Sequence, residues 1–150
     1  MNVLINKMSL VGPRPNTRKW GVDLYNEKEK LMLSVKPGIT DISSIVFSDE
    51  GEILKNSQNP DLKYNELIRP WKSRFSLWYL ENSSFSLDIV ICLCTLVSIF
   101  NKSIALRFIV YLLKKKNANP QLIEIATRKK LLYPYPPPGS NKIEDGSFYN

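Results

Sequence analysis

Two short loops of the sequence carry side chains that could bind phosphate. The first, Gly12-Pro13-Arg14-Pro15, sets one arginine between two prolines, whose restricted backbone angles make the loop stiff. A guanidinium on a stiff loop suits bidentate phosphate binding, because little conformational freedom is left to lose. The alternative is an ordinary turn with a solvent-exposed arginine.

The second loop, Lys36-Pro37-Gly38-Ile39-Thr40, offers a lysine, a flexible glycine and a hydroxyl group. It is not a P-loop, because that motif needs the pattern G-x-x-x-x-G-K-[ST] ahead of a helix. Its alternative is the C-terminal end of a helix. The candidate substrate- and phosphate-binding residues of the two loops are Pro13, Arg14, Pro15, Lys36 and Thr40.

The composition excludes several kinds of catalysis. Histidine is absent from the 150 residues, which excludes Ser-His and Cys-His chemistry within the chain. Two cysteines, Cys92 and Cys94, are too few for a disulfide framework or a zinc site. They are typical of small buried apolar residues in a reducing compartment. The composition therefore indicates no histidine-dependent catalytic site and no zinc site.

The positive charge of the chain is concentrated near its C-terminal end. The formal charge is +7, yet residues 1–100 hold 12 basic and 11 acidic side chains, whereas residues 101–150 hold 9 and 3. A local excess indicates an anionic partner for that part, such as lipid headgroups, a phosphorylated substrate or nucleic acid. The basic residues form no known motif for reading nucleic acid, so we expect no nucleic-acid partner.

A second group of residues is a candidate for contact with a membrane surface. Tryptophan favours the headgroup region of a membrane, and lysine pairs with anionic lipid. The alternative for the tryptophans is a place in the core, because their spacing also fits one face of a helix. The candidate membrane-surface residues are Trp71, Trp78, Lys114, Lys115 and Lys116. The longest apolar run, Ile89 to Phe100, has 12 residues, and a spanning helix needs about 20.

The elements that position these residues are mostly helical. Apolar periodicity and capping residues predict helices at 22–35, from Asn59-Pro60 onward with a break at Pro70, from Ser84 or Ser86 to about 100, at 102–116, and from Asn119-Pro120 to about 130. Beta-branched residues predict a short strand over 41–47. The proline-rich segment 133–150 is predicted to be polyproline-like or disordered. The expected fold is mainly α with short irregular β and loop segments.

The two loops lie inside a longer pattern. Asn2-Val3-Leu4 and Met8-Ser9-Leu10-Val11-Gly12-Pro13-Arg14-Pro15 are followed by Leu33-Ser34-Val35-Lys36-Pro37-Gly38-Ile39-Thr40, and then by Ile68, Pro70, Lys72, Tyr79, Asn82, Ser84-Phe85, Asp88-Ile89 and Thr95. In order and spacing this pattern resembles the bacterial sugar transferases, the monotopic polyprenyl-phosphate phosphoglycosyl transferases. The likeness covers residues 2–100, and it favours phosphate binding at Arg14 over an ordinary turn.

The resemblance implies an enzyme of the cytoplasmic face of the bacterial inner membrane, held there peripherally or monotopically. Such enzymes transfer a sugar-1-phosphate from a UDP-sugar to polyprenyl phosphate, with Mg²⁺, in capsule, exopolysaccharide, O-antigen or glycoprotein glycan assembly. Its implied partners are the UDP-sugar, the polyprenyl phosphate and an anionic membrane surface. The implied fold is a membrane-surface-associated phosphoglycosyl transferase-like fold.

The pattern also departs from the family. A membrane-inserted helix and an Asp-Glu catalytic dyad precede the first loop in the family, whereas no residue of this chain corresponds to either. We therefore expect an N-terminally truncated fold without the magnesium ligand, inactive unless a separate N-terminal fragment completes it. The alternative is a non-catalytic remnant that binds the membrane surface or a glycan-assembly partner. The expected units are 1–100, the C-terminal part of the transferase domain; 101–132, a basic amphipathic extension; and 133–150, a disordered tail.

Overall fold

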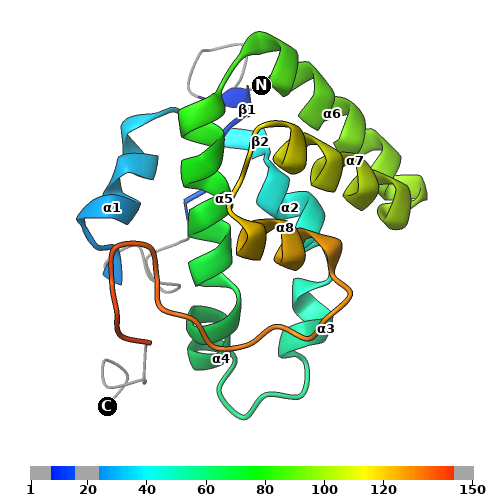
Figure 1. The fold of residues 1–150 in the computed structure, drawn as a ribbon. Coiled ribbons are helices and arrows are strands. Elements are labelled where there is room, and N and C mark those ends of the chain that lie inside the picture. The colour runs from blue at the N-terminus through cyan, green and yellow to red at the C-terminus, as the bar shows by residue number, and fades with distance from the viewer. Residues whose placement is uncertain (1–7, 16–23, 144–150) are drawn as a thin grey trace.

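The computed structural model of the protein describes residues 8–15 and 24–143. They form the mainly helical fold that the sequence predicts, with one small parallel sheet (Figure 1). Its two strands are β1 (Ser9–Val11) and β2 (Gly38–Thr40), with Ser9 opposite Gly38 and Val11 opposite Thr40. Strand β1 thus directly precedes the first candidate loop, and β2 consists of the last three residues of the second candidate loop.

The helix α5 (Arg69–Asn82) runs through the middle of the molecule (Figure 1). The preceding helix α4 (Pro60–Leu67) begins at the Asn59 cap, and the break predicted at Pro70 is confirmed, because Pro70 lies in the first turn of α5. The short helices α2 (Ile42–Val46) and α3 (Glu50–Leu54) connect β2 to α4. Phe75 and Ile68 are fully buried, so α5 and its approach form the centre of the core.

The C-terminal helices continue the same core. Helix α6 (Phe85–Phe100) is capped by Ser84 and packs against α7 (Lys102–Lys115), which is followed by α8 (Pro120–Thr127). A single hydrophobic cluster joins Ile68 of the preceding part to Ile109 of α7 and Ile125 of α8. The segment beyond residue 100 is therefore packed into the fold and is not a separate appendage.

The strand predicted over 41–47 is wrong. The strand is Gly38–Thr40, and residues 42–46 form helix α2. The side chain of Asp41 explains the difference, because its Oδ1 accepts a hydrogen bond from the backbone N–H of Ser44 at 2.7 Å. An N-terminal cap of this kind outweighs the preference of β-branched residues for strands, which depends on context.

The helix predicted over 22–35 is much shorter in the structure. Asn26 and Glu29 form a capping box, so helix α1 (Glu27–Lys30) begins only there, and a 3-10 turn η3 (Leu31–Ser34) follows it. Residues 22–23 lie outside the described residues. Apolar periodicity over 22–35 implies one buried apolar face, but Leu31 and Val35 are exposed and the charged Glu29 is buried.

The proline-rich tail is packed against the protein as far as the structure describes it. Residues 133–143 form neither helix nor strand, but the N–H of Tyr135 donates to the carbonyl oxygen of Glu66, and Asn26 Nδ2 donates to that of Pro138 at 2.8 Å. Figure 1 shows this segment crossing the end of α4 and α5 and returning beside α1. The disordered tail expected here is therefore wrong for residues 133–143.

Candidate phosphate-binding site

Gly12 and Gly38 bring the two candidate loops into backbone contact. A Cβ atom on Gly38 would lie 2.2 Å from the backbone N of Gly12, and one on Gly12 would lie 3.0 Å from the carbonyl oxygen of Lys36. The N–H of Gly38 also donates to the carbonyl oxygen of Pro13 at 3.3 Å. Only glycine allows so close an approach. The two motifs that the sequence sets apart are thus joined in one place.

A cavity of about 310 Å³ lies beside this contact, and we call it the loop cavity. Pro13 and Lys36 line it, together with Tyr79 and Ser83 from the end of α5 and the following turn. Arg14 is exposed on the loop next to Pro13, and Pro15 is half-buried. Of the predicted residues, Pro13 and Lys36 thus line the loop cavity, whereas Arg14 and Pro15 follow Pro13 in the chain and do not line it.

Thr40 differs from the prediction. Its hydroxyl group is buried and lies 2.7 Å from the hydroxyl of Thr95 on α6, which in turn donates to the carbonyl oxygen of Ile91. Thr40 does not line the loop cavity. The hydroxyl that we expected to meet phosphate instead joins β2 to α6.

Tyr79 fixes the position of β1 against the helices, a role that sequence analysis missed. Its hydroxyl donates to Asp88 Oδ1 of α6 at 2.7 Å and lies 3.4 Å from the carbonyl oxygen of Val11. Burial, followed by the hydrogen bond to Asp88, raises the pKa of this hydroxyl well above its ordinary value. Tyr79 therefore stays protonated and holds the strand that leads into the first loop.

The opposite end of α5 is fixed by a buried ion pair. Arg69 Nη2 donates to Glu29 Oε2 at 2.6 Å, its Nε donates to Oε1 at 3.1 Å, and neither side chain is exposed. Ser73 Oγ donates to Oε1 at 2.7 Å as well. Sequence analysis did not predict this pair, because the periodicity of one segment does not reveal a partner forty residues away.

The candidate membrane-surface residues separate into two groups. Trp71 and Trp78 are 0% and 7% exposed, so their assignment to the surface is wrong and they belong to the core. Tyr135 of the tail stacks on Trp71 with ring centroids 4.6 Å apart, which covers the indole. Lys114, Lys115 and Lys116 are exposed at the end of α7, where they are available to an anionic partner.

The residues around the loop cavity do not fit a magnesium site. Within residues 8–15 and 24–143, the structure contains no group of three histidine, cysteine, aspartate or glutamate side chains that could hold a metal ion. Magnesium prefers carboxylate and phosphate oxygens. The loops can thus contribute cations to a phosphate group, but the described residues offer no ligand cluster for the ion.

Comparison with known proteins identifies the family whose sequence pattern contains these two loops. The chain is 36% identical over 96 residues to the "Uncharacterized sugar transferase EpsL" of Bacillus subtilis (strain 168), which covers 62% of this chain and 38% of that protein. The chain thus spans well under half the length of this relative. No solved structure matches it. The pattern of the family described as "Bacterial sugar transferase" matches residues 1–102, about two thirds of the sequence, and the chain therefore belongs to the bacterial sugar transferase family.

Proposed function

We propose that the chain binds the diphosphate of a UDP-sugar as part of a transferase that moves sugar-1-phosphate to polyprenyl phosphate. The contact between Gly12 and Gly38 is the observation that carries this proposal, because it joins the loop of Arg14 to the loop of Lys36. Family membership supports a sugar nucleotide and a lipid phosphate as the substrates.

The two loops suit different parts of this task. Arg14 presents a planar guanidinium from between two prolines and can bind two phosphate oxygens at once, whereas Lys36 acts as a compact positive charge. In the transfer, the bond between the β-phosphorus, which carries the sugar, and the oxygen that bridges it to the α-phosphorus breaks. A bond from the β-phosphorus to an oxygen of polyprenyl phosphate replaces it, and UMP leaves with the bridging oxygen. Cations near these oxygens favour the step because they balance the charge of the phosphates.

The step itself is not assigned to a residue of this chain. No aspartate or glutamate precedes Gly12 in the 150 residues, and the family pattern implied by the resemblance places its Asp-Glu dyad there. We propose that these residues bind and orient phosphate, while the nucleophile and the magnesium ligands come from residues outside this 150-residue sequence. The polypeptide of these 150 residues is expected to be inactive by itself.

Two measurements test this proposal. Equilibrium dialysis should detect binding of labelled UDP-glucose, UDP-galactose or their N-acetyl forms, and Arg14→Ala should weaken it by roughly tenfold, since it removes a charge-assisted hydrogen-bond pair. Arg107→Ala, a change of an exposed arginine on α7, is the matched control and should bind as the original chain does. Equal binding by the Arg14→Ala variant would contradict the assignment of the loop.

Activity is measured in parallel. Purified chain is incubated with radiolabelled UDP-sugar, magnesium and polyprenyl phosphate, and labelled lipid is extracted. We expect none from the 150-residue polypeptide, so labelled lipid formed by it alone would show that the chain holds its own nucleophile.

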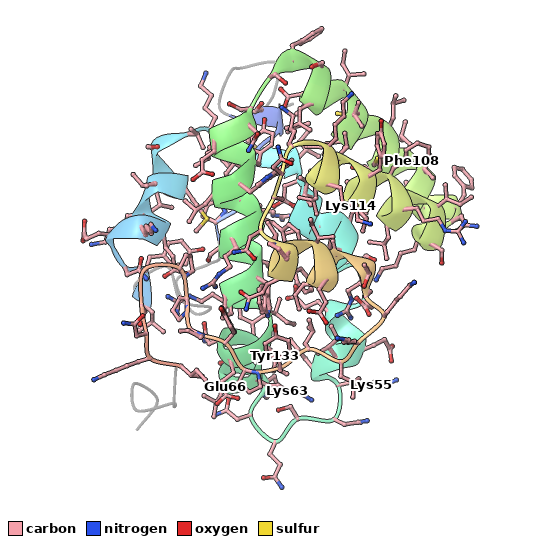
Figure 2. The ribbon with its side chains drawn as sticks, viewed as in Figure 1. Lys55, Lys63, Glu66, Phe108, Lys114 and Tyr133 are labelled. Atoms are coloured by element: carbon pink, nitrogen blue, oxygen red, sulfur yellow. The ribbon has the colours of Figure 1, made fainter. Side chains whose placement is uncertain are left out.

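The structure favours a second, non-exclusive function, which is attachment to a membrane surface. Exposed apolar side chains recur every three or four residues along the outer side of α6 and α7. They are Phe85, Ile89, Leu93, Leu96 and Phe100 on α6, and Ile104, Phe108 and Tyr111 on α7. Figure 2 shows Phe108 and Lys114 on α7. No helix in the described part of the chain is long and apolar enough to cross a bilayer.

We propose that this apolar side of the α6–α7 pair lies in the headgroup region of an anionic membrane. A row of eight exposed apolar side chains along two helices is unusual on the surface of a monomer. The exposed Arg107, Lys114 and Lys115 of α7 supply positive charge for acidic lipids. Each basic residue near such a surface contributes about 1 kcal/mol.

Flotation with vesicles tests the attachment. The chain should float with phosphatidylglycerol vesicles at low salt, and Leu96→Glu should abolish flotation because it sets a charge within the apolar side. Leu131→Glu is the matched control, since Leu131 is 93% exposed and lies outside α6 and α7. If both variants float alike, the α6–α7 side does not contact lipid.

A further inference from the structure

A second cavity, of about 450 Å³, lies on a different side of α5 from the loop cavity. Its lining comes from Lys28 of α1, from α5, from residues 116–119 after α7, from the first turn of α8, and from Pro138 and Gly139 of the tail. We call it the tail cavity. The family pattern ends at residue 102, so more than half of this lining belongs to the part of the chain that the pattern does not cover.

The lining of the tail cavity is positively charged. Lys28, Arg74 and Lys116 contribute three cations and Glu81 one carboxylate, which leaves a net charge of +2. The first turn of α8 also lines the cavity through Gln121 and Leu122, and the N-terminal end of a helix attracts anions. The charge of the lining therefore favours an anionic ligand.

Arg74 is the central cation of this lining. Its guanidinium carbon lies 5.4 Å from the ring centre of Trp71 and 4.6 Å from that of Tyr135, and Nη1 donates to the carbonyl oxygen of Pro70 at 2.9 Å. No acidic side chain within the described ranges forms an ion pair with it. The side chain is half-buried, and this burial lowers the pKa of the guanidinium. A partly desolvated cation without a counter-ion gains most from a bound anion.

The rest of the lining suits a polar ring carrying hydroxyl groups. Asn82, Asn117 and Gln121 offer amides that can both donate and accept hydrogen bonds. Trp71 and Trp78 supply apolar area, and the buried Nε1 of Trp71 has no acceptor among the described residues. Amides beside aromatic rings match the hydroxyl groups and the C–H faces of a sugar.

The tail closes the cavity at a position that only glycine fits. Gly139 has φ +88°, and a Cβ there would lie 3.2 Å from Cβ and Cδ of Lys28. Asn26 holds the neighbouring Pro138 through its carbonyl oxygen. The wall that Gly139 forms is thus fixed in place, next to one of the three cations.

We propose that the tail cavity binds an anionic sugar, meaning a sugar that carries a phosphate or carboxylate group. The anion pairs with Arg74, Lys28 and Lys116, and the sugar ring lies against the tryptophans and amides. This site shares no lining residue with the loop cavity, so the proposal does not rest on the transfer reaction proposed above.

Titration with four small probes tests the proposal. Glucose 1-phosphate, glucuronate, glucose and inorganic phosphate are added at constant ionic strength, and tryptophan fluorescence and heat of binding are recorded. We expect glucose 1-phosphate or glucuronate to bind at least tenfold more tightly than glucose and than inorganic phosphate. Tighter binding of glucose 1-phosphate would indicate a sugar that carries a phosphate group, and tighter binding of glucuronate a sugar that carries a carboxylate group. Equal affinity for glucose would overturn the role of the charge, and equal affinity for inorganic phosphate would overturn the role of the sugar.

Variants locate the site. Arg74→Gln should weaken binding at least tenfold, because it removes the buried cation. Arg107→Gln carries the same charge change on α7 and should bind normally. Since Arg74→Gln also removes ring contacts, Lys116→Gln on the surface is made as well and should weaken binding several-fold with an unchanged melting temperature. Normal binding by both Arg74→Gln and Lys116→Gln would overturn the proposal.

Discussion

Arg69 holds the carboxylate of Glu29 with two of its nitrogens, at 3.1 and 2.6 Å, in a place where neither side chain is exposed. Arg69 Nη2 donates to the carbonyl oxygen of Leu24 at 2.8 Å as well. The pair ties the first turn of α5 to α1, two elements far apart in the sequence. It compensates two buried charges, whose desolvation costs several kcal/mol each.

Breaking this pair should be costly. Arg69→Met leaves a buried carboxylate without its cation, and we expect the free energy of unfolding to fall by about 3–5 kcal/mol in urea denaturation. Lys30→Met is the matched control, since it breaks the exposed pair with Glu27 and should change stability by at most about 1 kcal/mol. If the two changes lower the free energy of unfolding by similar amounts, the buried pair contributes no more to stability than the exposed pair.

Gly38 should tolerate no side chain. Gly38→Ala sets a Cβ 2.2 Å from the Gly12 backbone, so the loops must separate. We expect the free energy of unfolding to fall by about 1–3 kcal/mol and UDP-sugar binding to weaken. Gly51→Ala is the matched control in α3, where nothing lies within 4 Å of the new Cβ. It should stabilise by about 0.5–1 kcal/mol. A neutral Gly38→Ala would contradict the close contact of the two loops.

Acid should weaken the attachment of α7 and α8 to α3. Burial alone would raise the pKa of Asp49, but hydrogen bonds from Lys102 at 2.9 Å and Arg128 at 2.8 Å, with their charges, lower it below its ordinary value. A lowered carboxyl pKa gives stability that is present above about pH 4 and is lost as the pH falls further. Unfolding free energies between pH 3 and 7 should show this loss.

Asp49→Asn isolates that part of the pH dependence. The variant should be less stable than the original chain at pH 7 by about 1 kcal/mol, because the carboxylate is partly exposed, and the difference should shrink towards pH 3. Glu52→Gln, a change of a largely exposed carboxylate of α3, should leave the profile unaltered. A difference for Asp49→Asn that stays constant with pH would rule out its titration as the cause.

The tail should stabilise the whole domain through Tyr135. Tyr135→Ala removes the ring stacked on Trp71, the contact with Arg74 and a hydrogen bond to Gln121 at 2.9 Å. We expect the free energy of unfolding to fall by about 2–3 kcal/mol and the melting temperature to be lower. Tyr111→Ala removes an exposed ring from α7 and should have little effect. An unchanged melting temperature for Tyr135→Ala would mean that the tail lies on the protein without supporting it.

Local signals in the sequence predicted the helices well. Asn59 and Ser84 each accept a hydrogen bond from the backbone three residues later, and this kind of contact is written into a few consecutive residues. Asp41 is an N-terminal cap of the same kind, but the β-branched residues after it predicted a strand instead. The signature around Arg14 and Lys36 predicted two residues that line the loop cavity, Pro13 and Lys36, because glycine and proline constrain the backbone wherever they occur.

Relations between distant segments could not be predicted in the same way. The partner of Arg69 lies forty residues earlier, and the hydroxyl of Thr40 is paired with Thr95 rather than presented to solvent. Trp71 shows the same limit, since its spacing fits a membrane belt or a core equally well. The tail that stacks on it decides the matter, and proline-rich composition gives no indication of that contact.

The stacking of Tyr135 on Trp71 also sets an order of events during synthesis. A ribosome makes the chain from its N-terminus, so α5 is complete well before residues 133–139 emerge. Throughout that interval Trp71 lacks the ring that stacks on its indole in the folded protein. The cover of this tryptophan is thus completed only after the helix that carries it has been made.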